Sequence, residues 1–196
     1  MRIILASKSP RRKELLGRLY SDFEIITKET DETLPEGVHP REGVAILAER
    51  KGKAVFYELC SRGEDLSDAL IISSDTLVEL FGEALGKPSS AEDACRMLKE
   101  LSGKAHNVHT GISVCRGGRF FSATDSTEVV FRELTDEEIE GYVRSGEPMD
   151  KAGSYAIQGG GGKFVTEING DFDTVVGLSV RLLSELIEKA LFGGAE

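Results

Sequence analysis

The feature that most constrains this chain is a short run typical of a buried strand, followed at once by an acid. Residues 69–74 read Ala-Leu-Ile-Ile-Ser-Ser and predict a central strand whose two faces are both covered. Asp75 follows directly, and the end of a central strand commonly opens into a ligand crevice. A carboxylate at such a place can bind a divalent metal or take a proton from water; the alternative is an Asx turn or a helix N-cap.

The remaining elements indicate what surrounds this strand. Strands are expected over residues 2–6, 23–27, 69–74, 108–115, 119–131, 164–168 and 172–176. Helices are expected over residues 11–19, 44–59, 89–101, 135–144 and 179–191. Two of these helices begin at capping boxes, Ser89 with Glu92 and Thr135 with Glu138. Alternating strands and helices early, with antiparallel hairpins later, predict an α/β fold with a mixed twisted sheet flanked by helices.

The composition limits the class of protein. With 40% hydrophobic residues among 196, the chain can bury a core, and no stretch approaches the length needed to cross a bilayer. Three widely separated cysteines exclude a disulfide framework and a CxxC metal site. A net charge of −10 disfavours general nucleic-acid binding, although one small anionic substrate can bind where cations gather locally. We expect a soluble cytoplasmic protein with no nucleic-acid or membrane partner.

Hydroxyl and basic side chains gather where the first helix is expected to begin. Ser9 and Pro10 suit the N-cap and the first turn, with Ser7 before them and Arg11 and Arg12 after them. A helix N-terminus favours negative charge, so cations there are unfavourable unless an anion joins them. The pattern predicts an anion cradle; the alternative is a solvated basic turn.

Two lysines are further candidates. Lys51 is in register with the apolar stripe of the helix over 44–59, so it faces inward and needs a partner, unless it extends to solvent at the edge of the stripe. Lys87 follows a glycine turn that looks like a phosphate loop but is one residue short and has Pro88 where Ser or Thr is required. Lys87 is therefore either a phosphate ligand or an ordinary surface lysine.

Three other polar features give weaker signals. Gln158, just before the glycines at 159–162, can both donate and accept hydrogen bonds, as recognition of a base edge requires. Those glycines form no GxGxxG between a strand and a helix. His106 and His109 are three residues apart on an expected strand, so they point to opposite faces and cannot readily chelate one ion.

Ordered motifs along the whole chain closely resemble those of the Maf family. They are Ser-Lys-Ser-Pro-Arg-Arg-Lys-Glu-Leu-Leu at 7–16, Ser-Asp-Thr at 74–76, Leu-Gly-Lys-Pro at 85–88, Leu-Ser-Gly at 101–103 with His106, Gly-Glu-Pro at 146–148, Asp-Lys-Ala-Gly-Ser-Tyr-Ala-Ile-Gln-Gly at 150–159 and Val-Val-Gly-Leu at 175–178. The resemblance implies one Maf-like domain over 1–196, with an inosine-triphosphatase-like α/β fold and two lobes around a cleft. Ser179 stands where the family usually has proline, which we expect to affect only the start of the last helix.

The same resemblance implies a nucleoside triphosphate pyrophosphatase that requires a divalent metal cation, Mg²⁺ or Mn²⁺, and suggests a homodimer. It makes Asp75 the proton acceptor. The phosphate-binding positions that it implies are Ser7, Arg11, Arg12, Lys51 and Lys87. We hypothesise that Asp75 and Glu32 hold the metal, with Asp31 and Glu29 as alternatives to Glu32.

Three positions mark, within the family, the branch that acts on dTTP and UTP: they correspond to Arg12, Thr76 and Gln158. The branch that acts on 7-methyl-GTP looks different at the last two. The resemblance therefore implies hydrolysis of dTTP and UTP, or of modified pyrimidine nucleotides in a house-cleaning role, to the monophosphate and pyrophosphate. The alternatives are a nucleotide-binding regulator of septum formation that acts through a protein partner, and a pyrophosphatase for modified purine nucleotides.

Overall fold

The protein is built on a seven-stranded mixed sheet flanked by helices, which confirms the predicted fold class. The computed structural model describes residues 1–34 and 36–193. The strands are β1 (Arg2–Leu5), β2 (Glu24–Ile25), β3 (Ala69–Leu80), β4 (Glu83–Leu85), β5 (Ala105–Arg116), β6 (Arg119–Phe131) and β7 (Val165–Asn169). The helices are α1 (Pro10–Leu16), α2 (Pro40–Ser61), α3 (Ala91–Leu101), α4 (Asp136–Arg144), α5 (Phe172–Val176) and α6 (Val180–Phe192), with short 3₁₀ turns η1 (Glu147–Asp150), η2 (Ala152–Ser154) and η3 (Gly160–Phe164).

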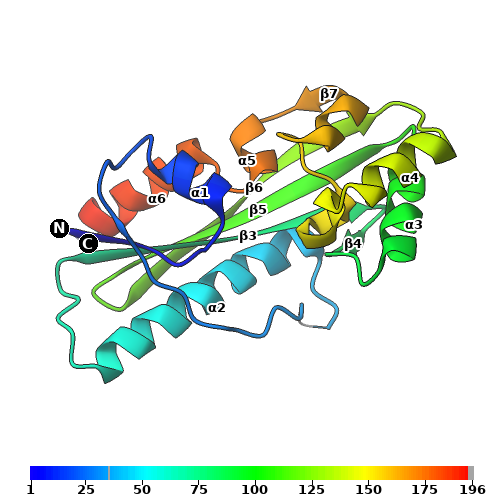
Figure 1. Cartoon of the computed structure of the whole chain (residues 1–196). Helices are drawn as coiled ribbons and strands as arrows, with labels where there is room; N and C mark the ends of the chain where they lie inside the picture. Colours follow the sequence, from blue (N-terminus) through cyan, green and yellow to red (C-terminus); the bar gives the residue numbers. More distant parts are fainter. Residues whose placement is uncertain (35, 194–196) are drawn as a thin grey trace.

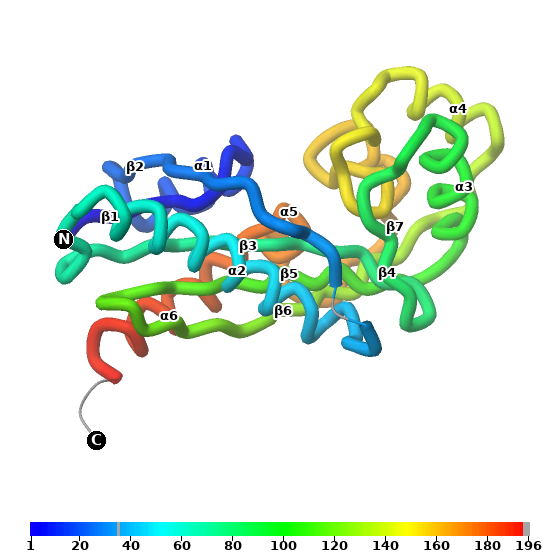
Figure 2. The backbone as a smooth tube through the Cα atoms, turned by 90° about the horizontal axis from the view of Figure 1, so that it is seen from below, coloured from blue at the N-terminus to red at the C-terminus, as the bar shows by residue number. Residues whose placement is uncertain are grey.

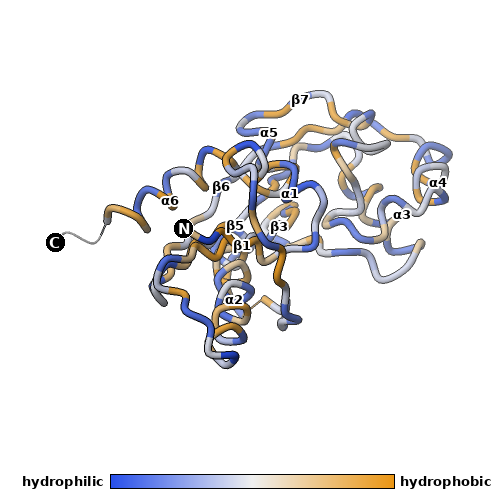
Figure 3. The backbone as a smooth tube through the Cα atoms, turned by 60° about the vertical axis from the view of Figure 1, so that its left-hand side comes forward, coloured by the Kyte–Doolittle hydropathy of each residue, from blue (hydrophilic) through white to orange (hydrophobic). Residues whose placement is uncertain are grey.

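The long strands β3, β5 and β6 form the centre of the sheet. Helix α2 covers one face of them, while α1, α5 and α6 lie on the other side (Figure 1). Figure 2 shows α3 and α4 grouped with β4 at one end of the sheet, away from the chain start, α1 and α6. Apolar colouring concentrates on the inner strands β1, β3 and β5 (Figure 3), in keeping with the fully buried Leu70, Ile72 and Val114. The long strands thus connect a group of elements that includes α3, α4 and β4 with one that includes β1, α1 and α6.

The pairing of β1 determines where the sheet has a free edge. Strand β1 runs parallel to β3, and its last residue, Leu5, lies opposite Ile72. Strand β3 continues to Leu80 in antiparallel pairing with β5, and β4 joins it only from Val78 onward. Among the described strands, none pairs with the intervening β1-side edge of β3. That edge lies beyond the carboxyl end of a parallel strand, where α/β sheets commonly bind ligands.

Among the local predictions, the type of element at 172–176 and the N-cap of α3 were wrong. Residues 172–176 form helix α5 rather than a strand, because Asp171 caps it by accepting the Asp173 N–H at 3.0 Å and Gly177, at φ 121°, ends it. Helix α3 is capped by Ser90 rather than Ser89, with the Ser90 hydroxyl accepting the Asp93 N–H at 3.2 Å. The Ser89 side chain instead bonds the Asp93 carboxylate.

Other local predictions are confirmed. The capping box of Thr135 with Glu138 begins α4, and Ser9 caps α1, as predicted. Ser179, which stands where the family usually has proline, is the N-cap of α6. A tight turn at Gly117 and Gly118 joins β5 to β6, with positive φ at both glycines. No helix in residues 1–34 or 36–193 combines the length and apolar character needed to cross a bilayer.

Candidate active site

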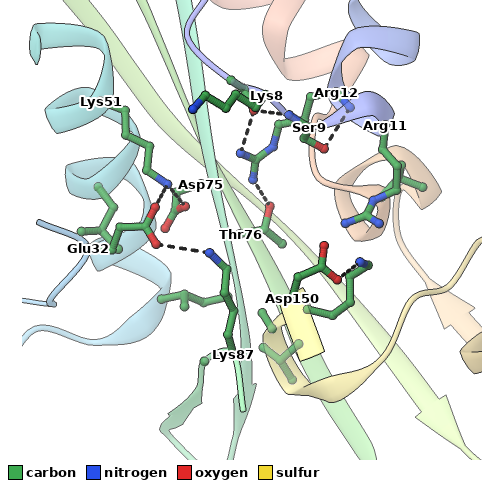
Figure 4. A pocket seen from close by; sticks show the side chains of 18 of the residues that line it. Lys8, Ser9, Arg11, Arg12, Glu32, Lys51, Asp75, Thr76, Lys87 and Asp150 are labelled. Atoms are coloured by element: carbon green, nitrogen blue, oxygen red, sulfur yellow. Dashed lines mark hydrogen bonds and ion pairs between the residues drawn. The ribbon is translucent and has the colours of Figure 1, made fainter. Parts of the chain in front are cut away.

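A cleft of about 1010 Å³ opens at the free edge of β3. Its walls come from the loop after β1, the start of α1, residues 27–32, α2, β3, the turn after β4, residues 150–157 and the end of α5. Side chains from α1, α2, β3 and the turn after β4 converge there (Figure 4). The structure therefore brings together segments that are far apart in the sequence.

Asp75 lies on the floor of this cleft, within β3 rather than after its end as the sequence predicted. It is paired with Gly111 of β5, and the antiparallel ladder runs on past it. The crevice arises because β1, not β3, ends here. The Asp75 side chain is 12% exposed, so this carboxylate needs a partner.

Lys51 supplies that partner from α2, which confirms the predicted inward orientation. Its ammonium lies 2.6 Å from Asp75 Oδ1 and 2.7 Å from Glu32 Oε1. The hydrogen bond from Lys51 lowers the pKa of Glu32. Lys87 approaches the other Glu32 oxygen at 3.4 Å, so one acid joins two of the predicted lysines.

Two glycines let α2 bring Lys51 close to the sheet. A Cβ on Gly52 would lie 2.8 Å from Ser73 Oγ, and a Cβ on Gly111 would lie 2.2 Å from the Val44 carbonyl oxygen. Any larger side chain at Gly111 would strike the helix backbone. The close approach sets the position of the Lys51 ammonium.

The start of α1 forms a second wall of the cleft. The Ser9 N–H donates to Ser7 Oγ at 3.2 Å, and the Ser9 side chain caps the helix. Lys8 and Arg11 line the cleft, and within the described residues neither forms an ion pair (Figure 4). These two cations are therefore available to an anion at the helix N-terminus.

Arg12 also lines the cleft, but most of its N–H groups donate hydrogen bonds to other residues of the protein. Its Nε donates to the Gly177 carbonyl at 2.9 Å, its Nη1 to the Ser74 carbonyl at 2.8 Å, and its Nη2 to Thr76 Oγ1 at 3.1 Å. Burial lowers its pKa, although the nearby Asp75 opposes that effect. Most of the N–H donors of Arg12 are therefore occupied, and these hydrogen bonds join α1 to β3 and to the end of α5.

Of the remaining predicted site residues, Thr76 and Lys87 line the cleft and Gln158 does not. Thr76 lines the cleft and, as the next residue on β3, faces the opposite side of the sheet from Asp75. Lys87 lines the cleft with a side chain that is 60% exposed. Gln158 is exposed and is not among the lining residues, although its neighbour Ile157 is.

The far side of the cleft is largely apolar, a feature that sequence reasoning did not identify. Its lining side chains are Val78, Val108, Tyr155, Ala156, Ile157, Val175 and Val176. Asp150 and Lys151 form an ion pair at the rim, and neither was singled out as a site residue. Their motif at 150–159 was the available signal. The cleft thus has a cationic part and an apolar part, as a nucleotide requires.

Glu32 and Asp75 are the residues best placed to hold a metal ion. An oxygen of each converges on the Lys51 ammonium, so the two carboxylates face one point. Within residues 1–34 and 36–193, no group of three or more acidic, histidine or cysteine side chains meets the requirements for a metal site. Two carboxylates suit Mg²⁺, which usually takes one or two of them together with substrate phosphates. The pair therefore fits a cation that arrives with a triphosphate.

The two histidines of β5 bind different partners, as expected. His106 Nε2 lies 2.9 Å from the Tyr155 hydroxyl, and burial lowers the pKa of His106 to about 4. His109 Nε2 lies 2.9 Å from Glu79, and its Nδ1 lies 2.8 Å from Ser126 Oγ. Neither lines the cleft.

Comparison with known proteins gives consistent results. The Maf family, described as Maf-like protein, matches residues 2–190. A dTTP/UTP pyrophosphatase of Bacillus velezensis is 46% identical over 193 residues, covering 96% of this chain and 98% of the relative. Proteins of the same name from Anaeromyxobacter dehalogenans and Thermococcus onnurineus are each 45% identical, covering 97% and 95% of this chain and 95% and 96% of their own lengths.

One solved structure is also similar in outline. The Staphylococcus aureus Ham1 protein covers 100% of both chains, with a TM-score of 0.45 and 17% identity.

Proposed function

We propose that this chain, which belongs to the Maf family, hydrolyses dTTP and UTP to the nucleoside monophosphate and pyrophosphate. The observation that carries the proposal is the Lys51 ammonium held between Glu32 and Asp75 on the floor of a cleft with cationic and apolar parts. The names of the similar proteins support the same activity.

The cationic part of the cleft binds the triphosphate. Lys8 and Arg11 lie at the N-terminus of α1, where free N–H groups also favour an anion, and Ser7 adds a hydroxyl. Lys51 and Lys87 face them across the cleft (Figure 4). Gathering these cations creates a local positive potential on a chain whose net charge is −10.

Asp75 accepts the proton of the attacking water. The water oxygen bonds to the α-phosphorus, the bond from that phosphorus to the bridging α–β oxygen breaks, and pyrophosphate leaves with that oxygen. Lys51 holds the Asp75 carboxylate in place through a 2.6 Å hydrogen bond. When a cation displaces it from the two acids, its ammonium is free to neutralise phosphate charge nearby. Asp75 is suited to this role because its otherwise buried side chain lines the cleft at the free edge of β3.

We include a divalent cation, Mg²⁺ or Mn²⁺, as the cofactor, with Glu32 and Asp75 as its protein ligands. When bound, it would neutralise triphosphate charge and stabilise the leaving pyrophosphate. Glu32 is favoured over Glu29 and Asp31 because its carboxylate already lies beside Lys51, whereas Asp31 pairs with Arg50 at 3.4 Å.

The apolar part of the cleft receives the nucleoside. Val175 and Val176 at the end of α5, together with Ile157, provide apolar surface for a base. Thr76 lies where the polar and apolar parts meet, and Gln158 follows Ile157 at the rim. We propose that Arg12, Thr76 and Gln158 together favour pyrimidine nucleotides, as their family branch suggests.

Three further features are proposed on the family resemblance alone: one Maf-like domain over 1–196, a homodimer, and a place in the cytoplasm. Size-exclusion chromatography with light scattering tests the dimer. A monomeric mass at micromolar concentration would contradict it.

A panel of nucleoside triphosphates tests the proposed activity. Release of pyrophosphate is measured with Mn²⁺ or Mg²⁺ for dTTP, UTP, CTP, ATP, GTP, ITP and 7-methyl-GTP. The proposal expects kcat/KM to be highest for dTTP and UTP. Preference for ITP or 7-methyl-GTP would instead support the purine alternative, and binding of nucleotide without hydrolysis would support a regulator of septum formation.

A further inference from the structure

A chain of hydroxyl groups runs from Arg12 across the sheet to α5. Thr76 of β3 lies directly opposite Thr110 of β5, and their Oγ1 atoms are 2.9 Å apart. Thr110 is fully buried, and its Oγ1 lies 2.7 Å from the Thr174 carbonyl oxygen. Arg12 Nη2 donates to Thr76 Oγ1 at the other end of the chain.

The partners at the two ends fix the direction of every hydrogen bond in this chain. A carbonyl oxygen can only accept, so the single proton of Thr110 goes to Thr174. Thr110 can then only accept from Thr76, whose own proton is thereby used. Arg12 has no acceptor, so it donates to Thr76. The order of donation is Arg12 to Thr76 to Thr110 to the Thr174 carbonyl.

This order determines what Thr76 can offer to the cleft. Its proton is bound by Thr110 and one lone pair takes the Arg12 N–H, so Oγ1 has one lone pair left and no free proton. Thr76 lines the cleft between the Asp75 side and the apolar wall of Val175 and Val176. A ligand edge that meets Thr76 Oγ1 must therefore donate a hydrogen bond.

We infer that Thr110 is a specificity-determining positioning residue: it holds the Thr76 hydroxyl as an acceptor and so favours bases whose edge carries an N–H. Uracil and thymine present N3–H as a donor, whereas N3 of cytosine is an acceptor. A lone pair facing a lone pair loses a hydrogen bond and leaves a polar atom unpaired, which a built site rejects strongly. The inference rests on the proposed pyrimidine nucleotide substrate.

Thr127 of β6 provides a matched control. It is fully buried, and its hydroxyl donates to the Asp171 carbonyl, just before α5, at 2.9 Å. It therefore attaches the same segment to the sheet as Thr110 does, but its hydroxyl has no contact with Thr76. Thr→Val keeps the shape and the β-branched side chain at either position and removes the hydroxyl.

The test compares the wild type with T110V, T110S and T127V. Values of kcat/KM for UTP and CTP are measured by pyrophosphate release, with thermal unfolding as the check on folding. Without its acceptor, Thr76 can turn its proton to the cleft, so the UTP-to-CTP preference should fall about five- to tenfold in T110V, the effect of one hydrogen bond. T110S should restore the wild-type preference, and T127V should keep it.

An unchanged preference in folded T110V overturns the inference, and so does an equal fall in T127V, which would assign the effect to looser attachment of α5. T110A, which removes the hydroxyl with a smaller side chain, carries the same test if T110V does not fold. A wild-type protein that releases no pyrophosphate from UTP would overturn the proposed function, and this inference with it. Activity on UTP with unaltered selectivity in T110V overturns the inference alone.

Discussion

Replacing Lys51 by Met should strengthen Mn²⁺ binding to the nucleotide-free protein while lowering its activity on UTP. Lys51 occupies the point on which the Glu32 and Asp75 carboxylates converge. A cation bound by both acids must displace the ammonium from them. Met keeps an unbranched apolar side chain on α2 but leaves the carboxylates without this competitor.

The size of the effect follows from the two ion pairs. The bond to Asp75, whose side chain is 12% exposed, lies in the range of about 1.5–3 kcal/mol for hydrogen bonds to charged groups. The bond to Glu32, which is 48% exposed, adds less than about 1 kcal/mol because solvent screens it. Taking about 2 kcal/mol in all, the Kd for Mn²⁺ should fall roughly 30-fold.

Free Mn²⁺ can be counted by electron paramagnetic resonance during titration of each protein without nucleotide. K53M is the matched control, because Lys53 lies on the same helix, pairs with Glu49 at 2.7 Å and does not line the cleft. K53M should bind Mn²⁺ as the wild type does. Equal or weaker binding by K51M would refute the reasoning that Lys51 competes with the metal.

Three further predictions concern the same structure. G111A should lower the free energy of unfolding by about 3 kcal/mol, because the new Cβ would lie 2.2 Å from the Val44 carbonyl oxygen; an unchanged urea midpoint would contradict this. K87M should raise the KM for UTP about three- to fivefold and change kcat less, since this exposed cation contacts Glu32 and the cleft only from the rim; an unaltered KM would exclude a role in binding. The pKa of His106 in the folded state, about 4, lies below its unfolded value of about 6.5. The neutral buried side chain therefore contributes fully to stability above pH 6.5, and this contribution is lost as the pH falls toward 4. Between pH 7.5 and 5, the free energy of unfolding in urea should fall by about 2 kcal/mol more for the wild type than for H106Q, and equal losses would contradict a neutral buried His106.

The sequence allowed the inward lysine and the main strands to be predicted, because both depend on local periodicity. Lys51 repeats with the apolar stripe of α2, and residues 69–74 lack polar alternation. The length of β3 was missed because Asp75 ended the apolar run, although the backbone ladder with β5 continues through it. Pairing between backbones does not depend on whether the side chains are apolar, so hydrophobic patterning does not predict it. For residues 172–176, the local caps of α5 prevailed over a β-like composition.

The partners of Arg12 could not be predicted from the sequence. The basic helix start and the family resemblance predict that Arg12 binds phosphate; in the structure it lines the cleft and donates to the carbonyls of Ser74 and Gly177. These lie 62 and 165 residues away along the chain, so only the fold brings them together. The apolar wall of the cleft is likewise assembled from β3, β5, residues 155–157 and α5, so no single segment of the sequence predicts it.

The most direct test of the account is pyrophosphate release from UTP by the wild type and by D75N, with Mn²⁺ or Mg²⁺ present. Asn keeps the size of the side chain but can neither accept a proton nor carry the negative charge that pairs with Lys51. We predict release of UMP and pyrophosphate by the wild type and a loss of about 10³-fold or more in D75N, with both proteins folded. Turnover by folded D75N at the wild-type rate would contradict the assignment of Asp75 as proton acceptor.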